Sequence, residues 1–269
     1  MSVIPNAVNG DKFTPEPNAR PRDRIVVVCM SRLVYRKGVD LLAQVIPKVC
    51  AARNDIDFLV GGDGPKRDVL HDMLAAHAHV LTPGRVTLLG DVDHDGGVRS
   101  VLTRGHIFLS ASLTESFGIA ILEAACCGML VVATAVGGIP EVLPHTIMRL
   151  APPDADALAS ACVAAAAECA ARRRNAKGVS EAEVQHAWEQ HEAVKAMYCW
   201  ADVAVRVERV YDKAAATSAT ALGRLRRYAA TGPFSGLLFA AVAVWDALLM
   251  RLLEWLVPVD SIDICPDLR

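Results

Sequence analysis

Residues 114–124 read T-E-S-F-G-I-A-I-L-E-A, and this stretch decides how the rest of the chain is interpreted. Two glutamates, Glu115 and Glu123, stand eight positions apart, and the apolar run 119–125 predicts a buried helix. Gly118 lets the backbone come close to a ligand just before that helix. At 1.5 Å per residue the two carboxylates lie roughly 10 Å apart, which suits a ligand as long as a nucleotide-sugar, with its diphosphate over the helix N-terminus. Taken alone, the pattern is better explained by an amphipathic helix with two solvated glutamates, and the ligand interpretation depends on the other motifs of the chain.

The segments around this stretch alternate between strand and helix. Apolar and β-branched runs predict strands at 24–29, 57–61, 86–89, 106–110, 129–134 and 146–150. Helices are predicted at 38–52, 65–79, 117–127 and 154–171, the second opened by Pro65 in its first turn. This alternation, with glycine-rich joins, predicts an α/β fold with a doubly wound parallel sheet, whose ligands bind at the carboxyl ends of the strands.

Composition restricts the class of protein. Hydrophobic residues make up 53% of the chain and the net charge is −2, which describes a core-rich protein without the basic excess typical of nucleic-acid binding. The eight cysteines lie largely in apolar runs and form no C-x-x-C pair or Cys/His cluster with metal-ligand spacing. We therefore expect buried thiols in a reducing compartment. The polar N-terminus lacks the apolar core of a signal peptide.

The second half of the chain is predicted to be helical. Residues 171–180 read as a loop, and 181–213 as one long helix that packs through Trp188, Tyr198, Trp200 and Tyr211. Residues 214–221 are small and typical of a linker that leads to the apolar run 234–257, which is long enough to cross a bilayer core of ~30 Å.

Three charged residues, Asp246, Arg251 and Glu254, interrupt that apolar run. Its twelve Leu, Phe and Val residues contribute roughly −5 kcal/mol to insertion, against about +3 kcal/mol for a central Asp246. The balance between these terms is close, and the two interpretations are a membrane helix and a buried terminal helix of a soluble protein. The predicted divisions are a linker remnant at 1–22, an α/β domain with C-terminal helices at 23–213, a linker at 214–233, the membrane helix at 234–257 and a tail at 258–269.

Further motifs follow the predicted strands. S-R-L-V-Y-R-K-G at 31–38 carries Arg32 and Lys37, a pair of cations suited to a diphosphate. G-G-D-G-P at 61–65 places Gly62 and Gly64 in a sharp strand-to-helix turn, and L-L-G at 88–90 places the backbone of Leu89 where it can read the edge of a base. G-G-I-P-E at 137–141 forms a glycine turn into a short helix. Each of these motifs alone is also typical of an ordinary loop.

In this order, the motifs resemble the nucleotide-binding half of a retaining glycosyltransferase with two Rossmann-like domains (GT-B). The stretches 31–42, 105–128 and 136–144 narrow the resemblance to the phosphatidylinositol glycan class A family, which is the catalytic subunit of phosphatidylinositol N-acetylglucosaminyltransferase. S-V-I-P-N-A-V at 2–8, V-E-R-V-Y-D-K at 207–213 and W-L-V-P-V-D-S-I-D at 255–263 extend it nearly end to end.

The resemblance implies the first step of GPI-anchor synthesis. N-acetylglucosamine would pass from UDP-N-acetylglucosamine to phosphatidylinositol with retention of the α configuration. The enzyme would work with other subunits of its complex, without a cofactor, a metal or a nucleic acid. It would sit in the endoplasmic reticulum membrane, with the catalytic domain in the cytoplasm and a single-pass C-terminal helix.

Roles for individual residues follow from the same resemblance. Arg32 and Lys37 would hold the diphosphate and offset the charge of the leaving group, and Glu115 would bind hydroxyls of the donor sugar, which makes these three the expected catalytic residues. Glu123 would bind the ribose. The other expected contacts to the UDP-sugar come from the backbone or from close approach, at Gly62, Gly64, Leu89, Phe117, Gly118 and Ile119.

The family also has an N-terminal acceptor-binding domain, which this sequence does not contain. We therefore expect the chain to keep the donor pocket and to be inactive, or nearly so, by itself. Two alternatives remain open. One is another retaining glycosyltransferase of the same superfamily, and the other is a non-catalytic, membrane-tethered subunit that binds nucleotide-sugars.

Overall fold

The computed structural model describes residues 3–173, 181–216 and 220–258. The chain forms two compact units, Met1–Val207 and Glu208–Arg269.

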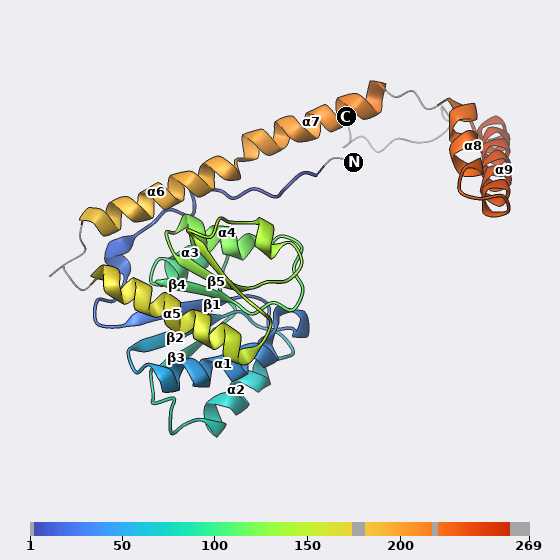
Figure 1. Cartoon of the computed structure of the whole chain (residues 1–269). Coiled ribbons are helices and arrows are strands. Elements are labelled where there is room, and N and C mark those ends of the chain that lie inside the picture. Colours follow the sequence, from blue (N-terminus) through green and yellow to red (C-terminus); the bar gives the residue numbers. More distant parts are fainter. Residues whose placement is uncertain (1–2, 174–180, 217–219, 259–269) are drawn as a thin grey trace. The chain divides into compact units, whose positions relative to one another are not determined.

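The first unit is built on a parallel six-stranded sheet (Figure 1). The strands follow the order β3-β2-β1-β4-β5-β6, which reverses direction between β1 and β4. This is the order of a doubly wound nucleotide-binding fold. The bounds of the strands are β1 Ile25–Met30, β2 Ile56–Gly61, β3 Val86–Gly90, β4 Ile107–Ser110, β5 Leu130–Thr134 and β6 Met148–Ala151.

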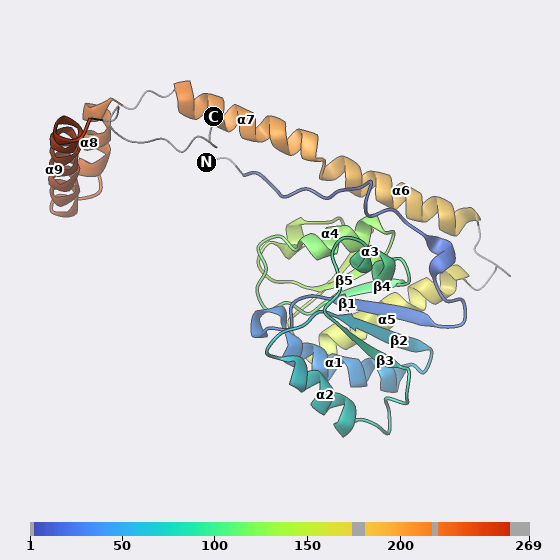
Figure 2. The same cartoon turned by 180° about the vertical axis from the view of Figure 1, so that it is seen from behind.

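Helices cover both faces of the sheet, as the two views show (Figures 1 and 2). One core lies between the sheet and α1 (Val39–Ala52), α2 (Arg67–Ala76) and α5 (Ala155–Arg173). The other lies between the sheet and α3 (Gly97–Leu102) and α4 (Ile119–Cys126), with α6 (Glu181–Met197) packed on α4.

Burial on both faces explains why the inner strands β1, β4 and β5 read as nearly unbroken apolar runs. Along β1, Val27 and Cys29 belong to the first core, whereas Val26 and Val28 belong to the second. Successive side chains point to opposite faces, so a strand covered on both sides must be apolar at every position. The predicted α/β fold class and parallel sheet are confirmed, and all six predicted strands are present within two residues of their expected bounds.

Three predictions about helices need correction. The six-residue α3 was not predicted, because its first turn contains glycine and it is too short to show a helical period. Residues 171–173 belong to α5 and not to a loop, while 174–180 lie outside the described residues. The predicted helix 181–213 is two helices, α6 and α7 (Trp200–Ala216).

The break between α6 and α7 coincides with Tyr198, which turns into the core. Its hydroxyl donates to the carbonyl oxygen of Val142 at 2.6 Å. Its ring meets Phe117 edge to face, at 5.4 Å between centroids. Trp188 is 41% exposed but packs edge to face on the ring of His191, at 5.2 Å between centroids. Trp200 and Tyr211 are 57% and 69% exposed, so the packing prediction is wrong for these two.

The second unit contains two further helices, α8 (Ala221–Ala229) and α9 (Ser235–Leu256). Helix α9 spans 22 residues, which corresponds to about 33 Å of helix. It is apolar enough to cross a membrane, and only 6% of its most apolar window is buried, unlike the core helix of a soluble protein. Helix α8 lies inside the stretch 214–233 that the sequence predicted to be a linker, so that stretch is helical in part.

Candidate functional site

The carboxyl edge of the sheet brings the predicted motifs together. The loop after β1 and the loop after β4 flank the point where the strand order reverses, which is where open α/β sheets bind their ligands. The two loops touch each other. The amide of Leu113 donates to the carbonyl oxygen of Arg36 at 2.9 Å. Gly38 adopts a φ of +69°, and a side chain there would place its Cβ 1.8 Å from the carbonyl oxygen of Ala111.

Lys37 and Glu115 form an ion pair across this reversal point. Their side chains are only 26% and 18% exposed, so the pair is partly shielded from solvent. Burial raises the pKa of Glu115, but the hydrogen bond and charge of Lys37, together with the backbone N–H groups of Ser116 and Phe117, outweigh it and hold the pKa below its ordinary value. Glu115 is therefore a carboxylate, suited to accept hydrogen bonds and not to donate a proton.

Arg32 lies on the same loop as Lys37 and is exposed. Within the described residues its guanidinium has no ion-pair or hydrogen-bond partner. It thus leaves its donors available to an anion, whereas Lys37 must exchange Glu115 for one.

The N-terminus of α4 lies on the loop that carries Glu115. Gly118 caps the helix with a φ of 84° and provides no side chain to bind the first N–H groups. In the part of the chain that the structure describes, the amides of Gly118 and Ile119 donate to no acceptor. Free amides and the positive end of a helix dipole make a site for phosphate.

Glu123 lies further along α4 and is only 8% exposed. Burial raises its pKa, and the nearby charges of His94 and Lys12 lower it by less. Among the described residues its carboxylate takes part in no hydrogen bond, and its oxygens are not completely shielded from solvent. A largely buried carboxyl group whose oxygens remain accessible is suited to accept hydrogen bonds from hydroxyl groups of a ligand.

Neither His94 nor Lys12 was given a role from the sequence. The loop that carries His94 follows β3, so its position after a strand was the only local signal that it belongs at this edge. Lys12 lies before the first strand and gave no signal.

The structure requires glycine at positions 62 and 64 for a steric reason that the sequence did not reveal. A Cβ at Gly62 would lie 1.9 Å from the carbonyl oxygen of Ser31, and one at Gly64 would lie 2.5 Å from that of Leu33. Both residues have positive φ, at +122° and +156°. These glycines let the loops after β1 and β2 lie against each other, which is separate from the room for a donor that the resemblance implies.

Two further predicted residues are partly buried and pack their side chains inward. Leu89 packs against the second core, and the carbonyl of the following Gly90 accepts a bond from the amide of Gly62 at 2.7 Å. Phe117 packs on Tyr198. Any contact of these residues with a ligand would therefore use the backbone of Leu89 and the exposed part of the Phe117 ring.

Side chains that the sequence did not single out hold the far end of α4. Gln190 and His191 come from α6, and Arg20 from the segment before β1. They bind the last carbonyls of the helix and those just beyond it, at distances of 2.8 to 3.0 Å, on Ala125, Cys126, Cys127, Gly128 and Met129. Those carbonyls would otherwise lack donors.

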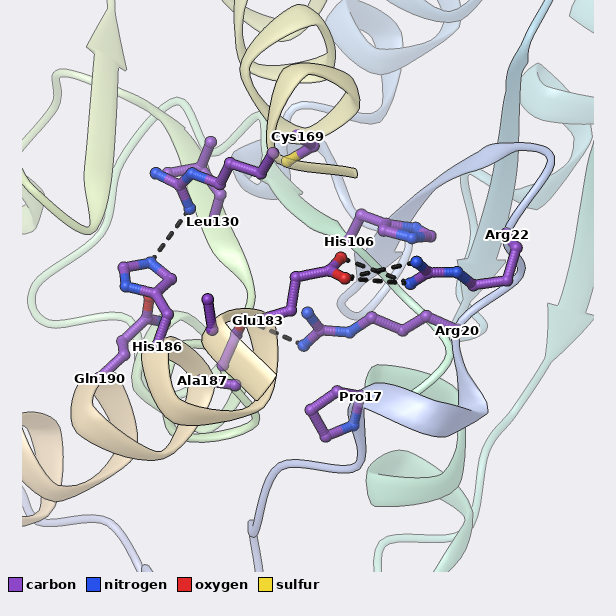
Figure 3. A pocket seen from close by; sticks show the side chains of 13 residues that line it. Pro17, Arg20, Arg22, His106, Leu130, Cys169, Glu183, His186, Ala187 and Gln190 are labelled. Carbon is purple, nitrogen blue, oxygen red and sulfur yellow. Dashed lines mark hydrogen bonds and ion pairs between the residues drawn. The ribbon is translucent and has the colours of Figure 1, made fainter. Parts of the chain in front are cut away.

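A cavity of about 250 Å³ lies at the opposite, amino edge of the sheet (Figure 3). It is lined by Leu130, the first residue of β5, and by His106, which precedes β4. Arg22 and Glu183 meet in it as an ion pair at 3.3 Å. Its position excludes it as the site formed by the predicted motifs.

Most cysteines are part of the hydrophobic core. Cys29, Cys50, Cys126, Cys127 and Cys162 are buried and unpaired, and burial raises the pKa of Cys126, Cys127 and Cys162 to about 12. Across residues 3–173, 181–216 and 220–258, no group of three or more His, Cys, Asp or Glu side chains could hold a metal ion.

Comparison with known proteins also indicates a glycosyltransferase. Residues 24–168 match the family described as Glycosyl transferases group 1. A relative from Arabidopsis thaliana, named as a subunit of phosphatidylinositol N-acetylglucosaminyltransferase, is 45% identical over 99% of this chain and 56% of its own length. The protein of the same name from Homo sapiens is 40% identical over 99% of this chain and 52% of its own length. The chain therefore spans about half the length of the curated relatives it matches.

Among solved structures, sucrose-phosphate synthase from Thermosynechococcus elongatus superposes with a TM-score of 0.63 and 27% identity. The superposition covers 80% of this chain and 53% of that one. It supports the assignment of the sheet and its helices to one half of a two-domain glycosyltransferase.

Proposed function

The chain belongs to the glycosyl transferases group 1 family, and from this premise we propose that it forms the donor-binding half of phosphatidylinositol N-acetylglucosaminyltransferase. It is homologous along nearly its whole length to the subunit of that enzyme from Arabidopsis thaliana and from Homo sapiens. The reaction is the transfer of N-acetylglucosamine from UDP-N-acetylglucosamine to phosphatidylinositol, the first step of GPI-anchor synthesis. The observation that carries the proposal is the convergence of Lys37, Glu115 and the uncapped N-terminus of α4 at the reversal point of the sheet.

The donor would lie along the loop after β4 and over α4. Arg32 and the amides of Gly118 and Ile119 bind the diphosphate, and Lys37 joins them by leaving Glu115. Glu115 accepts hydrogen bonds from hydroxyls of the sugar. Glu123, buried and without a hydrogen-bond partner in the described chain, receives the hydroxyls of the ribose.

The chemistry of this half is charge stabilisation. Negative charge grows on the distal phosphate as the glycosidic bond breaks, and Arg32, Lys37 and the helix N-terminus face that charge. The two glutamates do not act as an acid and base pair, because Glu115 is held ionised by Lys37 and Glu123 lies further along α4.

A glycosyltransferase cleft needs a second wall that positions the acceptor, and such positioning supplies much of the rate. We expect the polypeptide 1–269 to bind the donor and to turn over poorly by itself. Helix α9 anchors this half to the endoplasmic reticulum membrane, with the first unit in the cytoplasm. Arg224, Arg226 and Arg227 precede α9, and basic residues favour the cytoplasmic side of a membrane helix.

Two alternatives would give different results. A retaining transferase of the same superfamily with another donor would share the glutamates and the basic loop but prefer a different nucleotide-sugar. A non-catalytic, membrane-tethered subunit would bind the nucleotide-sugar, and joining it to the remaining half of a relative would produce no transfer.

Calorimetry with UDP, UDP-N-acetylglucosamine and GDP-mannose tests the proposal. The chain should prefer the two uridine compounds, and Glu123→Gln should weaken UDP binding about tenfold, the effect of about one lost charge-assisted hydrogen bond. The control Glu208→Gln removes an exposed carboxylate of α7 and should leave binding unchanged. Equal binding of GDP-mannose, or no binding of UDP, would contradict the proposal.

A further inference from the structure

The segment 8–16, which precedes the first strand, is packed on the helix that carries Glu123. Phe13 anchors the segment and is only 2% exposed. It belongs to the same core as Leu122 and Ala124, the two residues that flank Glu123 in α4. The position of this segment beside α4 is therefore fixed by the core and not by surface contacts alone.

Two polar contacts hold the segment on either side of Lys12. On one side, the ammonium group of Lys195 in α6 lies 2.7 Å from a carboxylate oxygen of Asp11. On the other side, the guanidinium of Arg99 in α3 donates to the hydroxyl of Thr14 at 2.9 Å. Lys12 thus lies on a short stretch that is attached to two different helices.

Lys12 and His94 gather around the ring of Phe13. The ammonium nitrogen of Lys12 lies 5.8 Å from the centre of that ring, and the ring of His94 meets it at 6.3 Å between centroids. Lys12 also lies 3.6 Å from a carboxylate oxygen of Asp95, but that side chain is 94% exposed. An ion pair with a partner so fully in water is weak. Asp95 therefore leaves most of the charge of Lys12 available to its other neighbours.

That neighbour is Glu123. Burial raises the pKa of its carboxyl group, and the charges of His94 and Lys12 act in the opposite direction. A carboxylate that loses water on burial needs nearby positive charge to remain ionised. Lys12 and His94 are placed to provide it.

The other charged groups around α4 act further along the helix. Arg99 of α3 acts on the thiol of Cys127, and Lys195 and Glu192 of α6 act on the thiol of Cys126. Both thiols are neutral at neutral pH, because burial raises the pKa of each to about 12. Among the described residues, the charges that act on Glu123 thus come from the segment before β1 and from the loop after β3.

We infer that Lys12 and His94 are positioning residues, which hold the carboxylate of Glu123 in its ionised form for the ribose of the donor. The inference rests on the proposed function, because it takes the ribose to be the ligand of Glu123. An ionised carboxylate accepts hydrogen bonds on both oxygens, and such bonds are roughly twice as strong as those between neutral groups. The segment 8–16 is thereby a working part of the donor site.

The test measures binding of UDP-N-acetylglucosamine to the full chain in mild detergent, by calorimetry from about pH 5 to about pH 8. This donor is chosen over UDP because its diphosphate has no terminal phosphate that titrates in that range. The affinity should fall toward acid as Glu123 gains a proton. Lys12→Met should move the midpoint of this fall to higher pH by about 0.5 unit or more, and His94→Gln should move it in the same direction.

Three further variants show whether the shift comes from charge acting on Glu123. Lys12→Arg keeps the charge and should keep the original midpoint. Lys195→Met is the matched control, since it removes a cation that holds the same segment but acts on Cys126 and not on Glu123. It should leave the midpoint unchanged. With Glu123→Gln already present, Lys12→Met should cause no further shift.

Two results would overturn the inference. One is an equal shift in Lys195→Met, which would show that any loss of charge or attachment in the segment has the same effect. The other is a loss of affinity in Lys12→Met that is the same at every pH, because Lys12 would then act by direct contact or by packing.

A pH series of unfolding free energies without ligand separates this inference from the proposed function. Because the pKa of Glu123 is raised, the free energy of unfolding should decrease as the pH rises through that value. Lys12→Met should extend this decrease to higher pH, and Glu123→Gln should remove it. Donor binding without a shift in either measurement rejects the positioning role alone. A shift in this series without donor binding rejects the donor site alone, and the absence of both rejects both.

Discussion

The ion pair between Lys37 and Glu115 should be broken by the nucleotide, and a double-mutant cycle can measure this. Lys37→Met and Glu115→Gln remove the charges and keep most of the volume. Two unit charges at 4 Å interact by about 4 kcal/mol at an effective dielectric constant of 20. Partial desolvation of side chains that are 26% and 18% exposed offsets part of this. We expect a coupling free energy of about 1–2 kcal/mol, above the typical ~0.2–1 kcal/mol of exposed pairs.

The assay is denaturant unfolding of the original chain, both single variants and the double variant, with and without saturating UDP. The proposed donor site has UDP draw Lys37 toward the diphosphate, so the coupling free energy should fall below about 0.5 kcal/mol when UDP is bound. The control is the pair Lys48–Asp156, whose side chains are 46% and 81% exposed. Its coupling should be small and should not change with UDP.

The pH dependence provides a second check. The folded-state pKa of Glu115 is lowered, so its stabilisation is present above the ordinary glutamate pKa and is lost as the pH falls through the lowered value. The coupling should therefore vanish in acid. A coupling no larger than that of Lys48–Asp156, or one that UDP leaves unchanged, would refute the exchange of partners.

Three further changes test other parts of the structure. Burial raises the pKa of Glu123, so the folded chain binds this proton more tightly than the unfolded chain does. The free energy of unfolding should therefore decrease as the pH rises through the raised pKa. Glu123→Gln should remove this decrease when the free energy of unfolding is measured over a pH series. Gly62→Ala should lower the free energy of unfolding by more than about 2 kcal/mol, because the added Cβ meets a carbonyl oxygen. Gly90→Ala should lower it by about 1 kcal/mol, because Gly90 has a positive φ but nothing within 4 Å of the added Cβ. Equal losses in urea titrations would contradict the steric argument. Removal of residues 220–269 should release the protein from membranes in alkaline carbonate, and release of the full chain would argue against α9 as a spanning anchor.

The sequence predicted the sheet well because burial on both faces leaves an unambiguous pattern. The inner strands β1, β4 and β5 are short apolar runs followed or ended by polar residues, and the alternation of strands with helices then indicated the doubly wound sheet. The helix boundary at Tyr198 was missed because the apolar pattern continues across it. What breaks the helix there is a tertiary contact, since Tyr198 bonds the carbonyl of Val142 and packs on Phe117.

Sequence reasoning located the residues of the candidate site that follow strands, and did not find those that come from elsewhere in the chain. Both Lys37 and Glu115 were expected to follow strands, and they meet because strands β1 and β4 are neighbours, an adjacency that the sequence analysis did not predict. His94 and Lys12 influence Glu123 through space, with no spacing in the sequence to relate them. The glycines at 62 and 64 were expected to make room for a ligand, whereas the carbonyls of the chain itself already require them.

The fastening of α4 at its far end has a mechanical consequence. The phosphate would bind at the N-terminus of this helix. Gln190 and His191 of α6 bind carbonyls at its C-terminal end, and Arg20, from the segment before β1, binds a carbonyl there as well. Helix α4 is therefore held by hydrogen bonds at its C-terminal end, while its N-terminal end is free to contact the ligand. A shift of α6 by a fraction of a helical turn would move α4 along its axis and change the donor pocket without disturbing a strand. If α4 binds nucleotide as proposed, contacts from α6 should therefore change the affinity from outside the sheet.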